Sequence, residues 1–350
     1  PSSSNPSITN VKKTSETGWD ESMVETGTEV SIIGTNFGAT QGTVTIGGFS
    51  ATVNSWTDTL IKVVVPAGAL TGTGENKVVQ ITTTGSKTAS WDELFVNSNL
   101  QTILTKAYSS KEAVFNSDAN ILYDIAGKNI YAYNFPTMTA RTPSNITYSV
   151  DSSFGCFYNN RIYVSNSNVD NYDKDLGDHN QIFSGTPPYS NTEGIRWNPY
   201  LQKMFVIVGS KLYSYKLDGS DQQLVYTDPS DITALDIDSD GYIHMTAFTR
   251  IITLNPNLTL NTNITNVAIS SYIYAKKVSS SIKLLFVTTA ESGTGISSIT
   301  VIKIKNDSTK TIIKKMIMPD DSYALDGING HEGKVIVTDE NKKKIYLMLF

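Results

Sequence analysis

An apolar, strand-like segment recurs about every forty residues after residue 97. When the segments are aligned on a central residue, successive centres lie 40, 42, 39, 42 and 50 residues apart. The six centres are Tyr123, Tyr163, Phe205, His244, Phe286 and Ile336. Repeats of this length indicate a propeller or a solenoid, in which each unit buries its faces against its neighbours.

A second apolar segment follows each centre. These segments are Asn129–Tyr133, Gln181–Phe183, Lys211–Tyr215, Ile251–Leu254, Ile299–Ile302 and Lys344–Met348. Six such units predict a six-bladed β-propeller at residues 98–350. The last unit ends on its third strand, so we expect Leu100–Thr105 to supply the missing outer strand and to lock the ring.

Residues 6–97 carry short segments in which apolar and polar residues alternate. Examples are Glu29–Ile33, Thr43–Ile46, Ile61–Val65 and Lys77–Ile81, each bounded by Gly, Pro, Asn or Asp. This pattern is typical of an immunoglobulin-like β-sandwich. No long segment has the spacing of a buried helix. The predicted fold class is therefore all-β, with the sandwich followed by the six-bladed propeller.

Four segments of the sandwich resemble the IPT/TIG domain family. They are Pro6–Thr9, Thr28–Gly38, Val44–Gly48 and Trp56–Pro66, in the order found in the family. The resemblance implies an immunoglobulin-like spacer, because the basic residues that DNA-binding members use are few here. After the sandwich, Ile232–Ile243 resembles NHL or YWTD-type propellers, which implies a blade pattern but no function. Together the two parts resemble bacterial surface proteins.

The charge balance and the ends of the chain bear on partners and location. The net charge is −5, and nothing in the sequence provides the basic face that nucleic-acid binding requires. No run reaches the ~18 apolar residues that span a membrane. Residues 1–5 read as a flexible polar tether that follows a removed signal peptide or a lipoprotein leader. We expect an extracytoplasmic protein, secreted or at the cell surface, with a lipid anchor upstream of residue 1 as one option.

The sequence contains no recognisable catalytic machinery. It has no nucleophile elbow, zinc motif or phosphate-binding loop, and its single cysteine, Cys156, reads as a buried hydrophobe. Asp236, Asp238 and Asp240 imitate the start of an EF-hand loop, but the twelfth position is Ala247 and not an acid. A tight turn between two strands explains these residues without a metal. We expect no cofactor, with Ca²⁺ as the open alternative.

One long polar loop is the first candidate for recognition. It runs from Ser165 to Asn180 and is expected to join the second and third strands of the second blade. Its candidate ligand-binding residues are Asp170, Tyr172, Asp173, Asp175, Asp178 and His179. Clustered carboxylates bind sugar hydroxyls or calcium, and the metal candidates are Asp173, Asp175 and Asp178. A solvated acidic loop without a ligand is the alternative.

A second group of candidates lies in the following inter-blade segment, which is expected to meet the same face of the ring. Tyr189, Trp197 and Tyr200 offer flat rings that stack on a sugar or a partner, and Glu193 and Arg196 offer polar contacts. The alternation of this segment allows Trp197 to be a core residue between two blades instead.

Three functions remain open from the sequence. The first is a non-catalytic binding or adhesion protein that recognises a glycan or a protein partner through the propeller face. The second is a polysaccharide hydrolase or lyase with Asp173, Asp175 or Glu193 as acid and base. The third is a structural subunit of a surface layer, a filament or a phage particle.

Overall fold

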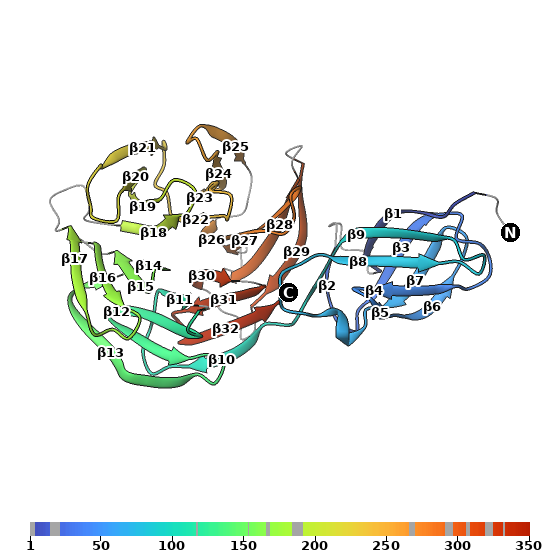
Figure 1. Cartoon of the computed structure of the whole chain (residues 1–350), viewed down its shortest axis with the longest axis horizontal. Helices are drawn as coiled ribbons and strands as arrows, with labels where there is room; N and C mark the ends of the chain where they lie inside the picture. The colour runs from blue at the N-terminus through green and yellow to red at the C-terminus, as the bar shows by residue number, and fades with distance from the viewer. Residues whose placement is uncertain are drawn as a thin grey trace.

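The computed structural model describes residues 4–14, 22–116, 118–152, 154–165, 169–183, 192–265, 270–290, 297–305, 309–318, 325–331 and 333–350. Within these ranges the chain is built of β-strands, without an α-helix, and a 3₁₀ turn spans Ala67–Ala69. The described residues include no helix that is long and apolar enough to cross a lipid bilayer. Figure 1 shows two parts, a ring of sheets and a sandwich beside it. The all-β prediction is confirmed.

The first part is a two-sheet sandwich. One sheet has the order β1 (Ser7–Lys13), β3 (Glu29–Thr35), β7 (Leu60–Val64) and β6 (Thr52–Trp56). The other has the order β2 (Met23–Glu25), β9 (Thr88–Asn97), β8 (Lys77–Thr82), β4 (Thr43–Ile46) and β5 (Phe49–Ser50). Buried side chains such as Ile32, Ile61 and Ile81 fill the space between the sheets. The immunoglobulin-like sandwich expected from the alternating segments is present.

The second part consists of six sheets in the described residues. The first sheet contains β11 (Glu112–Asn116), β12 (Ile121–Asn134) and β13 (Thr139–Ser152). The second contains β14 (Phe154–Tyr158), β15 (Arg161–Ser165), β16 (Val169–Asp173) and β17 (His179–Phe183). The third contains β18 (Thr192–Asn198), β19 (Lys203–Val208), β20 (Lys211–Tyr215) and β21 (Gln223–Thr227). The fourth sheet contains β22 (Ala234–Ile237), β23 (Ile243–Ala247), β24 (Arg250–Leu254) and β25 (Leu260–Ile264). The fifth contains β26 (Ser270–Lys277), β27 (Ile282–Ala290), β28 (Ser297–Lys305) and β29 (Lys310–Ile317). The sixth is β30 (Leu325–His331), β31 (Lys334–Asp339), β32 (Lys344–Leu349) and β10 (Gln101–Thr105).

The six sheets close into a ring. Their first strands are in contact in cyclic order, β11 with β14, then β18, β22, β26 and β30, and β30 returns to β11 (Figure 1). The ring is locked by β10, which precedes the first sheet in the chain but pairs antiparallel with β32 of the last. All six predicted centres lie on the second strand of a sheet. The expected closing strand at Leu100–Thr105 is therefore found, as Gln101–Thr105.

Each sheet buries both of its faces, which explains the continuous apolar runs. On β19, Met204 and Val206 pack in one cluster with Cys156 of the preceding sheet, while Phe205 packs in another with Leu235 of the following sheet. Successive side chains of a strand point to opposite faces, so a strand between two neighbouring sheets needs apolar residues at every position. This is the physical origin of the repeated segments.

The second sheet of the ring differs from its predicted form. The segment Gln181–Phe183 belongs to the fourth strand, β17, because Val169–Asp173 forms the third strand, β16. The predicted loop from Ser165 to Asn180 thus contains a strand with two buried polar residues, Asp170 and Asn171. Because these two residues are polar, the apolar pattern of the sequence did not predict this strand.

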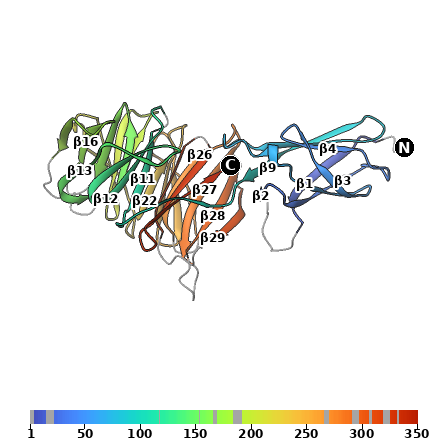
Figure 2. The same ribbon diagram turned by 90° about the horizontal axis from the view of Figure 1, so that it is seen from below.

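The sandwich is joined to the ring by direct contacts as well as by the chain. Met23 and Phe95 of the sandwich belong to the same buried cluster as Phe350 and Phe286 of the ring. The backbone N–H of Gly74 donates to the Phe350 carbonyl oxygen at 2.6 Å. Figure 2 shows the sandwich extending from the side of the ring that carries the C-terminus. The two parts are held as a continuous body at this junction.

Candidate functional site

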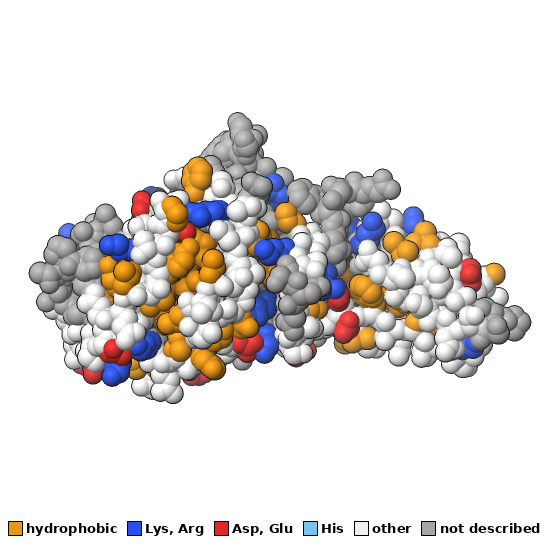
Figure 3. All heavy atoms as spheres, turned by 90° about the horizontal axis from the view of Figure 1, so that it is seen from above, with side chains coloured by type: hydrophobic (Ala, Val, Ile, Leu, Met, Phe, Trp, Pro, Cys, Tyr) orange, Lys and Arg blue, Asp and Glu red, His pale blue; other side chains and the backbone are white. Residues whose placement is uncertain are grey.

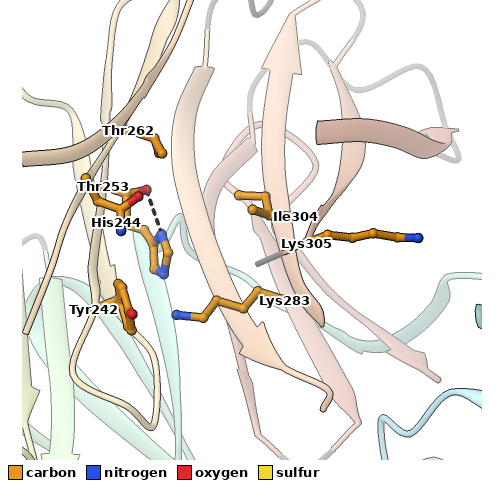
Figure 4. Close-up of a pocket in the computed structure, with 8 residues that line it drawn as sticks. Tyr242, His244, Thr253, Thr262, Lys283, Ile304 and Lys305 are labelled. Carbon is orange, nitrogen blue, oxygen red and sulfur yellow. Dashed lines mark hydrogen bonds between the residues drawn. The ribbon is translucent and has the colours of Figure 1, made fainter. Parts of the chain in front are cut away.

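A polar pocket lies between the fourth and fifth sheets of the ring (Figure 4). Its volume is about 90 Å³. Strands β23, β24 and β25 form one wall, and β27 and β28 form the other. The lining residues are Tyr242, His244, Thr253, Asn261, Thr262, Lys283, Ile304 and Lys305. This is the kind of concave, mixed surface that binds a small group.

Asp238 organises the charges beneath this pocket. Its Oδ2 lies 2.6 Å from Lys283 Nζ and 3.3 Å from His244 Nε2. Its Oδ1 accepts the backbone N–H groups of Asp240 and Tyr242 at 3.0 and 3.1 Å. Burial alone would raise the pKa of Asp238, but the hydrogen bonds and charges of His244 and Lys283 outweigh it and lower the pKa to about 2. The carboxylate therefore stays ionised and fixes both neighbours.

Two further contacts hold the pocket side chains in place. The Lys283 ammonium lies over the Tyr242 ring, 3.1 Å from its centroid, a cation–π arrangement. His244 Nδ1 lies 3.1 Å from Thr253 Oγ1, as the dashed line in Figure 4 shows. The cation of the pocket is thus held from two sides, by a carboxylate and by an aromatic ring.

A second charged cluster fills the centre of the ring. Arg196 on β18 places Nη2 2.5 Å from Glu112 Oε1 and Nε 3.2 Å from Asp236 Oδ1, and its Nη1 donates to the Gly155 carbonyl oxygen at 2.9 Å. Glu112 Oε2 accepts the Gly155 N–H at 2.9 Å, and Asp236 Oδ2 accepts the Ala275 N–H at 2.7 Å. These five residues come from five different sheets. The cluster therefore ties the inner strands together.

The central cluster does not have the form of an acid–base pair. Burial raises the pKa of Glu112 and of Asp236, and the Arg196 charge opposes this rise in both. One guanidinium contacts both carboxylates, so neither faces an open site. Cys156 lies near the cluster, and burial raises the pKa of its thiol to about 12. A thiol with this pKa remains protonated at neutral pH and is a poor nucleophile.

Residues 169–180 of the predicted recognition loop form a strand, a tight turn and the start of the next strand, and residues 166–168 lie outside the described residues. Asp170 and Tyr172 lie on β16, Asp173, Asp175 and Asp178 lie in or beside the β16–β17 turn, and His179 begins β17. His179 Nε2 lies 3.2 Å from Asp170 Oδ1, and the His179 ring stacks on Tyr172 with centroids 4.8 Å apart. Tyr172 is buried in the core between the first two sheets. The structure therefore brings three of the predicted residues together, but as a cross-strand contact.

The three calcium candidates are engaged within the protein. Asp173 Oδ1 accepts the backbone N–H groups of Asp175 and Gly177 at 3.1 and 2.7 Å, a turn-forming contact. Asp175 lies 2.8 Å from Arg141 Nη2, and Asp178 lies 2.9 Å from Arg161 Nη1. No group of three or more potential metal ligands is found among the described residues.

The predicted shared face is not formed by these two candidate groups. Consecutive turns of an antiparallel sheet lie at alternate ends, so the β16–β17 turn is at the opposite end of the sheet from Phe183, the last residue of β17. Tyr189 in the connection from β17 to β18 lies outside the described residues. Glu193 lies on β18, and its side chain is also outside the described set.

Two further predicted residues of this segment, Trp197 and Arg196, contact other parts of the ring. Trp197 is half-buried, stacks on Tyr158 with ring centroids 4.0 Å apart and packs against the cluster between the second and third sheets. These contacts favour the alternative in which Trp197 packs between two blades. Arg196 forms the central cluster and is not a surface contact. Tyr200 is 66% exposed in the β18–β19 turn.

The EF-hand-like aspartates separate in the structure. Asp236 points into the ring centre, Asp238 lies beneath the pocket, and Asp240 pairs with Lys277 at 2.8 Å. Gly241 has a φ of +84° in the turn between β22 and β23, a conformation that favours glycine. The turn interpretation of this segment is confirmed.

Sequence reasoning missed the pocket and most of its residues. Among the six repeat centres His244 stands where the others are aromatic or aliphatic, and this polar residue in a core strand is the signal that the sequence offers. Tyr242 and Lys283 are ordinary members of a turn and a strand end in the sequence. They meet only because neighbouring sheets pack side by side.

The outer side of the ring offers an apolar surface. Figure 3 shows hydrophobic side chains gathered on the side of the ring seen from above. On the outer strands β21 and β25, Leu224 and Leu260 are 54% and 56% exposed. This surface differs in chemistry from the pocket.

Comparison with known proteins identifies the sandwich and describes the fold of the rest. The chain has no significant match among curated proteins. An auxiliary nutrient binding protein from Bacteroides thetaiotaomicron is 12% identical, with 99% of this chain and 98% of that chain covered and a TM-score of 0.49. A protein from the same organism, named provisionally as a phosphatase, is 11% identical over 99% and 97%, with a TM-score of 0.52.

A chain of a nidogen/laminin complex is 12% identical, covers 73% of this chain and 95% of its own length, and has a TM-score of 0.52. At such low identity these similarities concern the fold alone. Residues 6–99 match the IPT/TIG domain family, which confirms the resemblance seen in the sequence, so the sandwich of this chain is an IPT/TIG domain.

Proposed function

We propose that this chain is a non-catalytic, extracytoplasmic binding or adhesion protein that recognises a surface glycan or a protein partner. In this proposal the six sheets form a six-bladed β-propeller that serves as a rigid binding platform. The IPT/TIG domain is a spacer that holds the platform away from the cell surface.

The observation that carries this proposal is the difference between the paired charged residues at the ring centre and the accessible pocket between two sheets. At the centre, Arg196 contacts both Glu112 and Asp236, so these carboxylates are occupied in joining the inner strands. Between the fourth and fifth sheets, by contrast, a polar pocket remains accessible. A fixed, polar concavity beside central carboxylates that are already paired supports recognition without chemistry.

The contacts of the acidic residues also favour binding over hydrolysis. The hydrolase or lyase alternative uses Asp173, Asp175 or Glu193 as an acid or a base, and the Glu193 side chain lies outside the described set. Asp173 accepts backbone hydrogen bonds in its turn, and Asp175 is paired with Arg141. These partnered carboxylates remain partly exposed, and we propose the β16–β17 turn as a secondary polar contact for the ligand. Within the described residues, no contact singles out the third alternative, a structural subunit.

The junction between the two parts supports the spacer role. Phe95 of the sandwich is buried with Phe350 of the ring, and Glu93 lies 3.1 Å from Lys303 and 2.5 Å from Lys305. A spacer that is fixed to its platform in this way sets the direction in which the platform faces. A flexible linker would not.

The proposal is tested by a glycan array and a pull-down from surface extracts with the full chain, combined with a reducing-sugar assay on the same glycans. We expect saturable binding to a glycan or a protein and no release of reducing ends. Turnover of any bound polysaccharide would establish the hydrolase or lyase instead. Absence of binding in both formats would refute a recognition role.

A further inference from the structure

We propose that the pocket between β24 and β27 binds an anionic oxygen group, so that the ligand is an acidic glycan carrying a carboxylate or a sulfate. This inference rests on the proposed binding function and adds the chemical class of the ligand. It concerns a site that includes none of the residues singled out as binding candidates from the sequence.

The charged residues that line the pocket are both lysines, and the carboxylates that pair with them lie outside the lining. Lys283 and Lys305 are its charged residues, and the others include His244, Thr253 and Asn261. Asp238 lies behind the wall, with its side chain fully buried. A negatively charged group in the pocket therefore meets ammonium, hydroxyl and amide groups, while the carboxylates of Asp238 and Glu93 are each paired with a lysine.

The charge that faces the pocket belongs to Lys283. Lys305 turns its ammonium away, as Figure 4 shows, and pairs with Glu93 of the sandwich at 2.5 Å. The side chain of Lys283 is 16% exposed, and its ammonium is held by Asp238 and the Tyr242 ring. An ammonium has three donors, and Asp238 accepts one of them. The cation is thus in place before a ligand arrives, which reduces the entropy lost on binding.

The volume sets the size of the group that enters. A pocket of about 90 Å³ has room for a carboxylate or a sulfate group. Beside this group the ligand would meet Asn261, which is exposed, and Thr262, which is half-buried. An amide and a hydroxyl are donors and acceptors suited to sugar hydroxyls. The geometry therefore combines a buried anion contact with a polar rim.

Isothermal titration of the full chain tests this inference with matched probes. The probes are an oligogalacturonate, its fully methyl-esterified form and a sulfated galactan oligosaccharide of the same length. We expect the ester to bind at least about tenfold more weakly than the acid, because a charge-assisted hydrogen bond is lost. Preference between the carboxylate and the sulfate probe identifies the source of the anion.

Variants locate the contact. Lys283→Gln should weaken binding of the acidic probe by about tenfold or more, and Lys211→Gln, an exposed lysine on another sheet, should leave it unchanged. Lys283 also pairs with Asp238, so Thr262→Val is the second variant, which keeps every charge and should weaken binding several-fold. If the protein binds the acidic and the esterified probe with equal affinity, and if neither variant changes this affinity, the acidic-ligand inference is overturned. The proposed binding function is not affected by that result. Failure of every glycan and protein to bind overturns both.

Discussion

Arg196 is the residue on which the ring centre depends. It is the single cation between two buried carboxylates, Glu112 and Asp236, and it comes from a different sheet than either. Removing one partner of a buried ion pair leaves an uncompensated charge and costs about 3–5 kcal/mol. We therefore expect Arg196→Met to lower the unfolding free energy by several kcal/mol, as measured by urea denaturation.

An exposed pair in the same ring provides the matched control. Lys111 pairs with Glu340 at 2.9 Å, and the two side chains are 40% and 34% exposed. Exposed pairs contribute about 0–1 kcal/mol, so Lys111→Met should have a small effect. Equal destabilisation by the two substitutions would contradict the role assigned to Arg196.

The contribution of Asp238 to the stability of the fold depends on pH. Its pKa is lowered to about 2, whereas an unfolded aspartate titrates near about 3.9. A group whose native pKa is depressed stabilises the fold above its unfolded pKa and loses this contribution as the pH falls through the native pKa. The stability difference between wild type and Asp238→Asn should shrink by about 2 kcal/mol from about pH 5 to about pH 2. Urea titrations at each pH measure it; a constant difference argues against the pairing with Lys283 and His244.

Among the strands, β10 has the clearest test, because it closes the ring from outside its own sequence neighbourhood. Leu104 of β10 faces Ile345 of β32 across the ladder and packs against the cluster between the first and last sheets. Leu104→Asp places a charge against this cluster and should cost about 1–3 kcal/mol. Faster proteolytic cleavage at β10 and a lower melting temperature are the expected readouts. Gln101→Asp, an exposed position on the same strand, should change neither measurement.

The same strands show what a sequence pattern can and cannot reveal. The closing strand was predictable because the last repeat lacked its outer member and an unused apolar segment preceded the first. The third strand of the second sheet was not predictable, since Asp170 and Asn171 are buried there and paired with His179 and Arg161. Polar residues that are satisfied inside a sheet look like a loop in the sequence. The six residues that the sequence analysis placed in a loop lie instead on a strand, in the turn that follows it and at the start of the next strand.

The pocket escaped prediction for a different reason. Its walls come from two sheets, and the meeting of Lys283 with Asp238 and Tyr242 depends on how these sheets pack. The forty-residue period fixes the number and order of sheets but not which strand ends face one another. Trp197 is a related case, because alternation allowed both a surface and a core position, and only the stacking on Tyr158 decides between them.

In the whole molecule, the fifth sheet is a basic element inside an acidic protein. Residues 270–318 contain eight lysines and two acidic residues, while the net charge of the chain is −5. Its lysines pair outward, with Asp238 and Asp240 of the fourth sheet and with Glu93 and Glu25 of the sandwich. The lysines of this sheet therefore connect it to the fourth sheet beside the pocket and to the IPT/TIG domain.

The attachment also depends on a close approach of two glycine backbones. A Cβ at Gly333 would lie 2.2 Å from the Gly74 backbone nitrogen, and Gly333 has a φ of +78°. Gly333→Ala must therefore separate the ring from the sandwich as well as strain its own turn. We expect the wild type to unfold in one calorimetric transition and Gly333→Ala to unfold in two, the first at a lower temperature.

A glycine without such contacts gives the control for this experiment. A Cβ at Gly85, in the sandwich, would meet only the Thr83 hydroxyl at 3.8 Å, so Gly85→Ala should keep the single transition. Small-angle scattering should show a larger radius of gyration for Gly333→Ala alone, because a spacer released from its platform samples other orientations. A single transition and an unchanged scattering curve for Gly333→Ala would mean that the glycine contact is not what fixes the domain in place, and the rigid-spacer role would lose its structural basis.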